Sequence, residues 1–222
     1  MEANMESYKR EFIEFLQSAG VLKFGDFTAK SGRKIPYFIN AGEIKTGDQI
    51  SRLGEFYAKA YFDKIGDKRC VLYGPAYKGI PIAVSAAGAL SRSGLDVPFF
   101  FNRKEAKDHG EGGVFVGYVP KAGEDIVIVE DVITAGTAIR ESMEILAPLT
   151  ECKVAATFVM VDRKEKGKGE KSAMQEVADE FGFPVYSVVD VYDIIEFLEE
   201  DEANRENVDR IKKYLEVNGA KA

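Results

Sequence analysis

The chain has 222 residues, of which 45% are hydrophobic and 30% charged. These are typical values for a globular protein that buries a substantial core. Its 30 basic and 37 acidic residues give a net charge of −7, which argues against a general nucleic-acid binder, whose affinity depends on many cationic contacts to phosphates. The N-terminal segment has no apolar core of signal-peptide length, and no apolar run approaches the ~20 residues of a membrane span. We therefore expect a soluble, cytoplasmic, single-domain protein that binds neither nucleic acids nor membranes.

The first part of the chain predicts a helix, a small antiparallel pair of strands and a second helix. Aromatic and aliphatic residues recur at helical spacing over residues 7–18. Two short β-like segments, 22–29 and 35–40, flank the turn sequence KSGRK and predict a hairpin. A further helix is expected after Gly47-Asp48 and up to about residue 65, with Asp48 as its N-cap.

From residue 70 onward, strand-like and helix-like segments alternate. Continuous apolar strands separated by helices predict an α/β fold with a mostly parallel central sheet flanked by helices on both faces. In such sheets ligands bind beyond the carboxyl ends of the strands, so the residues after each strand are the candidates for chemistry. The predicted strands are 70–73, 97–101, 126–129, 154–161 and 185–189, with a hairpin arm at 115–119 and a charged loop after residue 101; the predicted helices are 79–93, 138–149, 172–181, an acidic helix after 189 and a last helix near 208–217.

The strongest candidate site follows the predicted strand 126–129. Glu130 and Asp131 end that strand, and Thr134-Ala-Gly-Thr137 turns into a helix. Threonine hydroxyls and backbone N–H groups at a helix N-terminus bind anions, and Gly136 lets the backbone approach a ligand. The segment lacks the lysine and the spacing of a Walker A loop. Since a phosphate would repel the two carboxylates, we interpret them as contacts to ribose hydroxyls or to a bridging cation; a structural turn capped by threonine is the alternative.

Two further loops carry the positive charge that such a ligand needs. Residues 74–79, Gly-Pro-Ala-Tyr-Lys-Gly, place Lys78 before a helix and suit a second anion, although a plain tight turn has the same composition. Residues 103–109 hold four potential cations and are followed by glycines, which favours a mobile lid over a solvated loop. Two anion sites, an acidic pair and a cationic lid together indicate a sugar that carries both phosphate and pyrophosphate.

At this point the sequence resembles a known family. VEDVITAGTA (129–138) resembles the phosphoribosyl-diphosphate (PRPP) signature of the type I phosphoribosyltransferases, and the runs 29–42, 74–83, 101–113 and 133–145 are similar to those of the orotate phosphoribosyltransferases in particular. The resemblance implies the type I fold with a small N-terminal hood, formed mainly by residues 1–45 and part of the C-terminal region. It implies transfer of phosphoribose from PRPP to orotate, giving orotidine 5′-monophosphate and pyrophosphate in pyrimidine synthesis. It also implies Mg²⁺, held mainly through PRPP rather than by an assigned protein ligand, and a homodimer in which the neighbouring subunit's loop completes each active site.

The resemblance also assigns roles to individual residues. Arg163 is expected to pair with the carboxylate of orotate, because a guanidinium fork recognises a carboxylate at two points. Glu130 departs from the aspartate that is common at its position, and Ile39 from a common aromatic residue. The expected catalytic residues are Lys104, Lys107, His109 and Asp131; the expected PRPP contacts are these four with Lys30, Tyr77, Lys78, Arg103, Glu130, Val132, Ile133, Thr134, Ala135, Gly136, Thr137 and Ala138; the expected orotate contacts are Phe38, Ile39, Thr134 and Arg163.

Three other functions share parts of this pattern. A phosphoribosyltransferase for a purine or uracil would have the same PRPP site, but Arg163 and the SGRKIPYF segment suit a small acidic base. A PRPP-sensing regulator keeps the signature but can lose the cationic loop and often adds a DNA-binding domain, for which the first residues of this chain are too few. An inactive nucleotide-binding scaffold is the third alternative.

Overall fold

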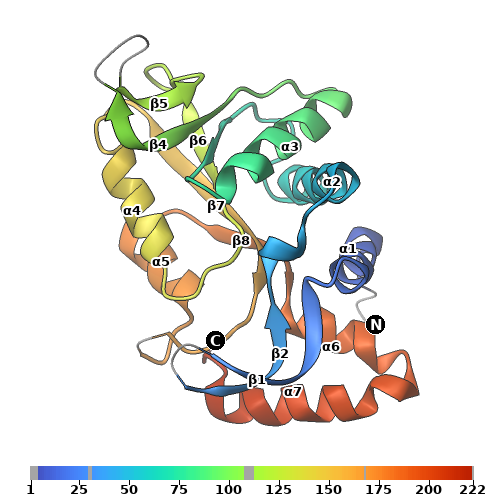
Figure 1. Ribbon diagram of the computed structural model, residues 1–222. Helices are drawn as coiled ribbons and strands as arrows, with labels where there is room; N and C mark the ends of the chain where they lie inside the picture. Colours follow the sequence, from blue (N-terminus) through green and yellow to red (C-terminus); the bar gives the residue numbers. More distant parts are fainter. Residues whose placement is uncertain (1–4, 30–31, 108–112, 168, 222) are drawn as a thin grey trace.

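A computed structural model describes residues 5–29, 32–107, 113–167 and 169–221, with the backbone alone at residues 106 and 107 (Figure 1). One sheet has six strands in the order β5-β4-β3-β6-β7-β8, in which β5 is antiparallel to β4 and the other neighbouring pairs are parallel. The prediction of a mostly parallel α/β sheet is confirmed. The strands are β3 (Val71–Gly74), β4 (Phe99–Lys107), β5 (Gly113–Gly117), β6 (Asp125–Val129), β7 (Lys153–Asp162) and β8 (Val185–Asp190).

Both faces of the sheet are buried, which explains why its strands have continuous apolar sequences. Successive side chains of a strand point to opposite faces. In β6, Val127 and Val129 join the larger core cluster, whereas Ile126 and Ile128 join a second one. The larger cluster includes residues of α1 (Ser7–Ser18), α2 (Gly47–Lys64), α3 (Gly79–Arg92) and α6 (Val191–Glu199), and the second includes residues of α4 (Thr137–Leu146) and α5 (Ala173–Phe181). Figure 1 shows α2 and α3 on one side of the sheet and α4 and α5 on the other.

A small separate layer lies beyond the sheet and is called the hood below. It contains the antiparallel pair β1 (Leu22–Thr28) and β2 (Lys34–Ile39), which confirms the predicted hairpin. The last helix, α7 (Arg205–Asn218), packs against β2, and the rings of Tyr37 and Tyr214 meet edge to face at 6.5 Å. Figure 1 shows α7, from the far end of the chain, running beside β1 and β2. Two short 3₁₀ turns, Ala41–Glu43 and Glu202–Asn204, complete the elements.

Two local predictions were wrong. The N-cap of α2 is Thr46 rather than Asp48: the Thr46 hydroxyl accepts a hydrogen bond from the Gln49 N–H, and the Gln49 side chain accepts one from the Thr46 N–H. This reciprocal capping box uses two backbone donors that a helix end leaves unpaired. The charged segment after residue 101 is not a loop at first, because β4 continues to Lys107 by pairing with β5. No helix in the described parts of the chain is both long and apolar enough to cross a bilayer.

Candidate active site

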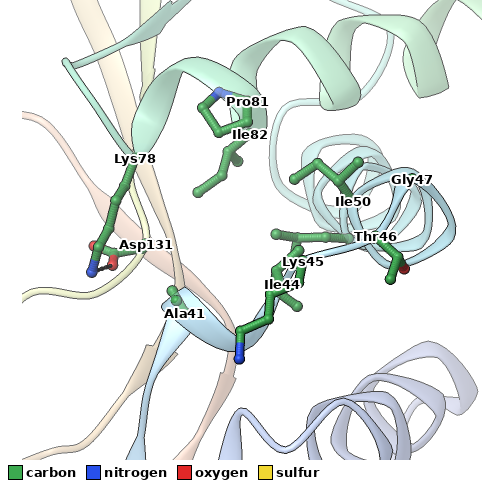
Figure 2. A pocket seen from close by; sticks show the side chains of 12 residues that line it. Ala41, Ile44, Lys45, Thr46, Gly47, Ile50, Lys78, Pro81, Ile82 and Asp131 are labelled. Carbon is green, nitrogen blue, oxygen red and sulfur yellow. Dashed lines mark hydrogen bonds and ion pairs between the residues drawn. The ribbon is translucent and has the colours of Figure 1, made fainter.

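The candidate site lies at the carboxyl edge of the sheet, where the segments after β3 and β6 meet. Lys78, directly before α3, reaches across this edge, and its Nζ lies 2.9 Å from Oδ2 of Asp131, after β6. Figure 2 shows this ion pair. Two loops that are 53 residues apart in the sequence are thereby joined, as expected for ends of neighbouring parallel strands.

The acidic pair is buried and held by its own backbone. Glu130 and Asp131 are each only 6% exposed. The Glu130 carboxylate accepts a hydrogen bond from the Asp131 N–H at 3.0 Å, and the Asp131 carboxylate accepts one from the Val132 N–H at 2.8 Å. The Tyr57 hydroxyl, from α2, donates to the Glu130 carbonyl at 2.6 Å. Burial raises the pKa of Glu130 to about 8, and the neighbouring Asp131 charge adds to the rise. Burial therefore favours the protonated form of the Glu130 carboxyl.

The turn after the acidic pair leads into α4 through a left-handed glycine. Gly136 has φ +72°, and a Cβ there would lie 2.7 Å from Val177 and 2.9 Å from the Arg140 guanidinium. Arg140 Nη1 donates to the Ala135 carbonyl at 2.6 Å, and its Nε donates to Glu180 at 2.8 Å. Packing and backbone conformation thus already require Gly136. Thr134, Ala135, Thr137 and Ala138 are exposed at the start of the helix, as an anion site requires.

The 74–79 turn is too tight for side chains at either end. A Cβ at Gly74 would lie 2.6 Å from the Gly79 carbonyl carbon, and one at Gly79 would lie 2.5 Å from Pro75. The buried side chain of Asn102 braces the turn, since its Oδ1 accepts from the Ala76 N–H at 3.0 Å and from the Tyr73 hydroxyl at 2.8 Å. The peptide bond between Ala76 and Tyr77 is cis.

The cationic segment begins beside this turn. Lys104 Nζ lies 4.8 Å from the centre of the Tyr77 ring, a cation–π contact, and that ring is 67% exposed. Arg103 Nη1 donates to the Gly113 carbonyl at 3.2 Å. For Lys107 only the backbone is described, paired with Gly113. His109, like Lys30 of the hood, lies outside the described residues.

A cavity of about 580 Å³ lies between the hood and the turn before α4. Its walls contain all four residues expected to contact the acceptor, Phe38, Ile39, Thr134 and Arg163, together with Val132, Ile133 and Ala135 of the turn. Phe38 is supported from behind by Phe27, whose ring is stacked with it at 5.4 Å. The cavity therefore has both apolar walls, from Phe38 and Ile39, and guanidinium groups, from Arg33 and Arg163.

Comparison with known proteins identifies the family. Residues 40–188 match the phosphoribosyl transferase domain. The orotate phosphoribosyltransferase of Vibrio cholerae is 53% identical over 95% of this chain and 97% of that protein, and the one of Clostridium acetobutylicum is 46% identical over 98% and 100%. A crystal structure of the Francisella tularensis orotate phosphoribosyltransferase has a TM-score of 0.83 and 38% identity, over 95% of this chain and 100% of that one. The chain belongs to the orotate phosphoribosyltransferase family. Enzymes of this family are pentosyltransferases.

The structure adds residues that the sequence alone did not single out. Tyr57 and Asn102 brace the two loops of this phosphoribosyltransferase from helices and strands far away in the sequence. A second cavity, of about 450 Å³, lies on the other side of the Lys78–Asp131 pair, between the segment that leaves the hood and the start of α3 (Figure 2). Its walls include Lys45 and Ile50 in addition to Lys78 and Asp131.

Proposed function

We propose that this chain transfers the 5-phosphoribosyl group of PRPP to orotate, giving orotidine 5′-monophosphate and pyrophosphate, with the acceptor in the cavity between the hood and α4. The observation that carries the proposal is that Phe38, Ile39, Thr134 and Arg163, from three separate segments, line one cavity next to the phosphate-binding turn. The apolar residues suit the faces of a flat ring, and the guanidinium suits its carboxylate.

The donor occupies the carboxyl edge of the sheet in this proposal. The turn from Val132 to Ala138 holds the 5-phosphate through backbone N–H groups and threonine hydroxyls at the start of α4. Glu130 and Asp131 contact the ribose hydroxyls, and Tyr77 and Lys78 contact the pyrophosphate. The side chains of Lys78 and Asp131, which lie 2.9 Å apart, must then separate. Contacts of PRPP to both residues replace the ion pair between them.

The chemistry asks mainly for electrostatic stabilisation. Displacement at the anomeric carbon develops positive charge on the ribose and negative charge on the departing pyrophosphate. The carboxylate of Asp131 faces the former, and Lys78, Arg103, Lys104, Lys107 and His109 face the latter. Closure of the cationic segment excludes water that would hydrolyse PRPP. The oxygen atoms of Asp131 and Glu130 at this edge fit Mg²⁺, which prefers oxygen ligands. The ion, held mainly through PRPP, would neutralise charge on the pyrophosphate.

The quaternary part of the proposal is a cytoplasmic homodimer in which the 103–109 segment of one subunit serves the site of the other. The similarity of residues 101–113 to the family supports it. Mixing Lys107→Ala subunits with Arg163→Ala subunits tests it. If the 103–109 segment crosses to the other subunit, a mixed dimer contains one site with both Arg163 and Lys107 unchanged. Recovery of activity on mixing supports a shared site, whereas no recovery despite subunit exchange contradicts it.

The activity itself is tested by incubating the chain with PRPP, Mg²⁺ and orotate, and following the loss of orotate absorbance. Uracil and hypoxanthine serve as control acceptors. Turnover of orotate is expected. Turnover of a control base but not of orotate would contradict the proposal. Omission of Mg²⁺ is expected to abolish turnover.

A further inference from the structure

Two segments of the chain, 33–37 and 163–165, meet at the half-buried carboxylate of Glu165 in the wall of the acceptor cavity. Glu165 Oε1 lies 2.6 Å from Arg163 Nη2 and accepts a hydrogen bond from the Tyr37 hydroxyl at 3.3 Å. Its Oε2 lies 3.5 Å from Arg33 Nη1. Tyr37 also places its ring against Arg163, with the guanidinium carbon 5.1 Å from the ring centre. Arg33, Arg163 and Glu165 all line the cavity.

The Arg163 guanidinium needs the charge of a neighbour because few of its hydrogen-bond donors have partners. Its Nε and Nη2 are buried and make no well-aligned hydrogen bond to any described residue. Burial alone would lower the pKa of Arg163, and the Tyr37 hydroxyl and the Glu165 carboxylate outweigh that effect and raise it. A buried charge without a nearby opposite charge is costly. Glu165 therefore supplies the opposite charge that allows Arg163 to stay in the cavity wall.

The backbone around Glu165 is fixed, so the carboxylate is a rigid anchor. The Lys166 N–H donates to the Asn218 carbonyl at 2.9 Å, and the Ala220 N–H donates to the Lys164 carbonyl at 2.7 Å. These hydrogen bonds tie the segment after β7 to the end of α7 on both sides of Glu165. Preorganised support of this kind reduces the ordering cost when a ligand binds.

The cluster formed by Arg33, Glu165 and Arg163 has one more positive charge than negative charge. Arg33 and Arg163 carry two positive charges, and Glu165 carries one negative charge. The wall also contains Asp162, which pairs with Lys164 at 2.9 Å, Lys166, which pairs with Glu170 at 3.6 Å, and Glu176. Within the group of Arg33, Glu165 and Arg163, the carboxylate of an acceptor would compensate the second guanidinium, whereas an uncharged base would not.

We propose that Glu165 is a positioning residue that favours a carboxylate-bearing acceptor: it pairs with both Arg163 and Arg33 and holds the Arg163 guanidinium in the cavity wall. The proposal rests on the role proposed above for Arg163. Glu165 does not contact the reacting atoms and acts through the two guanidinium groups.

The test is the Glu165→Gln variant, which keeps size and hydrogen-bonding capacity but removes the charge. The KM for orotate is expected to rise about tenfold, the scale of one lost charge-assisted contact, with kcat and the KM for PRPP little changed. The inhibition constant of uracil against orotate is expected to stay the same, because uracil has no carboxylate. Glu170→Gln is the matched control, since it makes the same change in the same loop at an exposed residue outside the cavity wall.

Other outcomes separate the possible failures. An unchanged or lower KM for orotate in Glu165→Gln overturns the inference, and so does an equal loss for orotate and uracil, which would mean general loosening of the pocket. If Arg163→Ala leaves the KM for orotate unchanged, the proposed role of Arg163 fails first. If Arg163→Ala raises it but Glu165→Gln does not, only the positioning role fails. Should Glu165→Gln not fold, Glu165→Asp carries the same test, because it withdraws the carboxylate by one methylene group.

Discussion

Replacing Glu130 by glutamine is expected to change how the stability of the protein depends on pH. Burial raises the pKa of this carboxyl from its ordinary 4.5 to about 8 in the folded state. Between these two values the folded chain binds a proton that the unfolded chain has lost. The stabilisation that Glu130 contributes through this proton is complete below about pH 4.5 and is lost as the pH rises through about 8.

The shift sets the size of the effect. At about 1.4 kcal/mol per pH unit, a rise from 4.5 to about 8 bounds the loss at about 5 kcal/mol of unfolding free energy at high pH. Lys78 lowers the pKa of Glu130, and the value of about 8 already includes this effect. Glutamine has no charge at any of these pH values, so Glu130→Gln should gain stability relative to the unchanged chain as the pH increases.

Urea unfolding of both proteins at pH 5, 7 and 9 measures the effect. The difference in unfolding free energy, variant minus unchanged chain, is expected to increase by a few kcal/mol from pH 5 to pH 9, on the order of the bound above. Glu170→Gln is the control, because Lys221 lowers the pKa of that exposed carboxyl and it is ionised in both states across this range. A difference that stays constant from pH 5 to pH 9 for Glu130→Gln would refute the reasoning, since Glu130 would then be ionised in the folded protein.

Three further changes have definite expected outcomes. Lys107→Ala should lower kcat by on the order of 100-fold in a steady-state assay, the scale for losing one preorganised charge contact; a near-normal kcat contradicts its role in the lid. Lys78→Met should raise the KM for PRPP about tenfold or more in the same assay, because both Asp131 and the pyrophosphate lose their cation; an unchanged KM would place the pyrophosphate elsewhere. Gly54→Ala should destabilise the chain by about 1–3 kcal/mol in urea, because its Cβ would lie 2.5 Å from the Ser85 carbonyl between α2 and α3. Gly47→Ala, in the same helix but with open space around it, should not, and equal losses would refute the packing argument.

Local sequence determined the elements and the main anion-binding turn. The alternation of apolar strands and helices gave the parallel sheet, because a strand buried on both faces needs apolar residues at successive positions. The acidic pair and the Thr134–Thr137 turn followed from one short stretch, since their geometry depends on a strand, a turn and a helix that are consecutive in the chain. The rule that strand ends share an edge explains why Lys78 lies near Asp131, although the sequence did not predict this ion pair.

Two other predictions failed. In one, a neighbouring residue was the better N-cap, and in the other, pairing with a separate strand determined the backbone conformation. Asp48 and Thr46 are both good N-caps, and the choice fell to Thr46 because Gln49 completes the capping box. Residues after 101 have the charges of a loop, but pairing with β5 keeps them in a strand. Lys30 and His109 lie outside the described residues, and their roles are predictions.

The sequence by itself therefore determined the family, the sheet and the strand–turn–helix proposed to bind phosphate, because each depends on local pattern or on a contiguous motif. Only the tertiary structure decided how the site is braced. Tyr57 reaches Glu130 across 73 positions of the chain, and Arg33 reaches Glu165 across 132. Such contacts leave no periodic signal, since they arise only when packing of the helices and the hood brings the partners together. The raised pKa of Glu130 and the support of Arg163 both come from this burial.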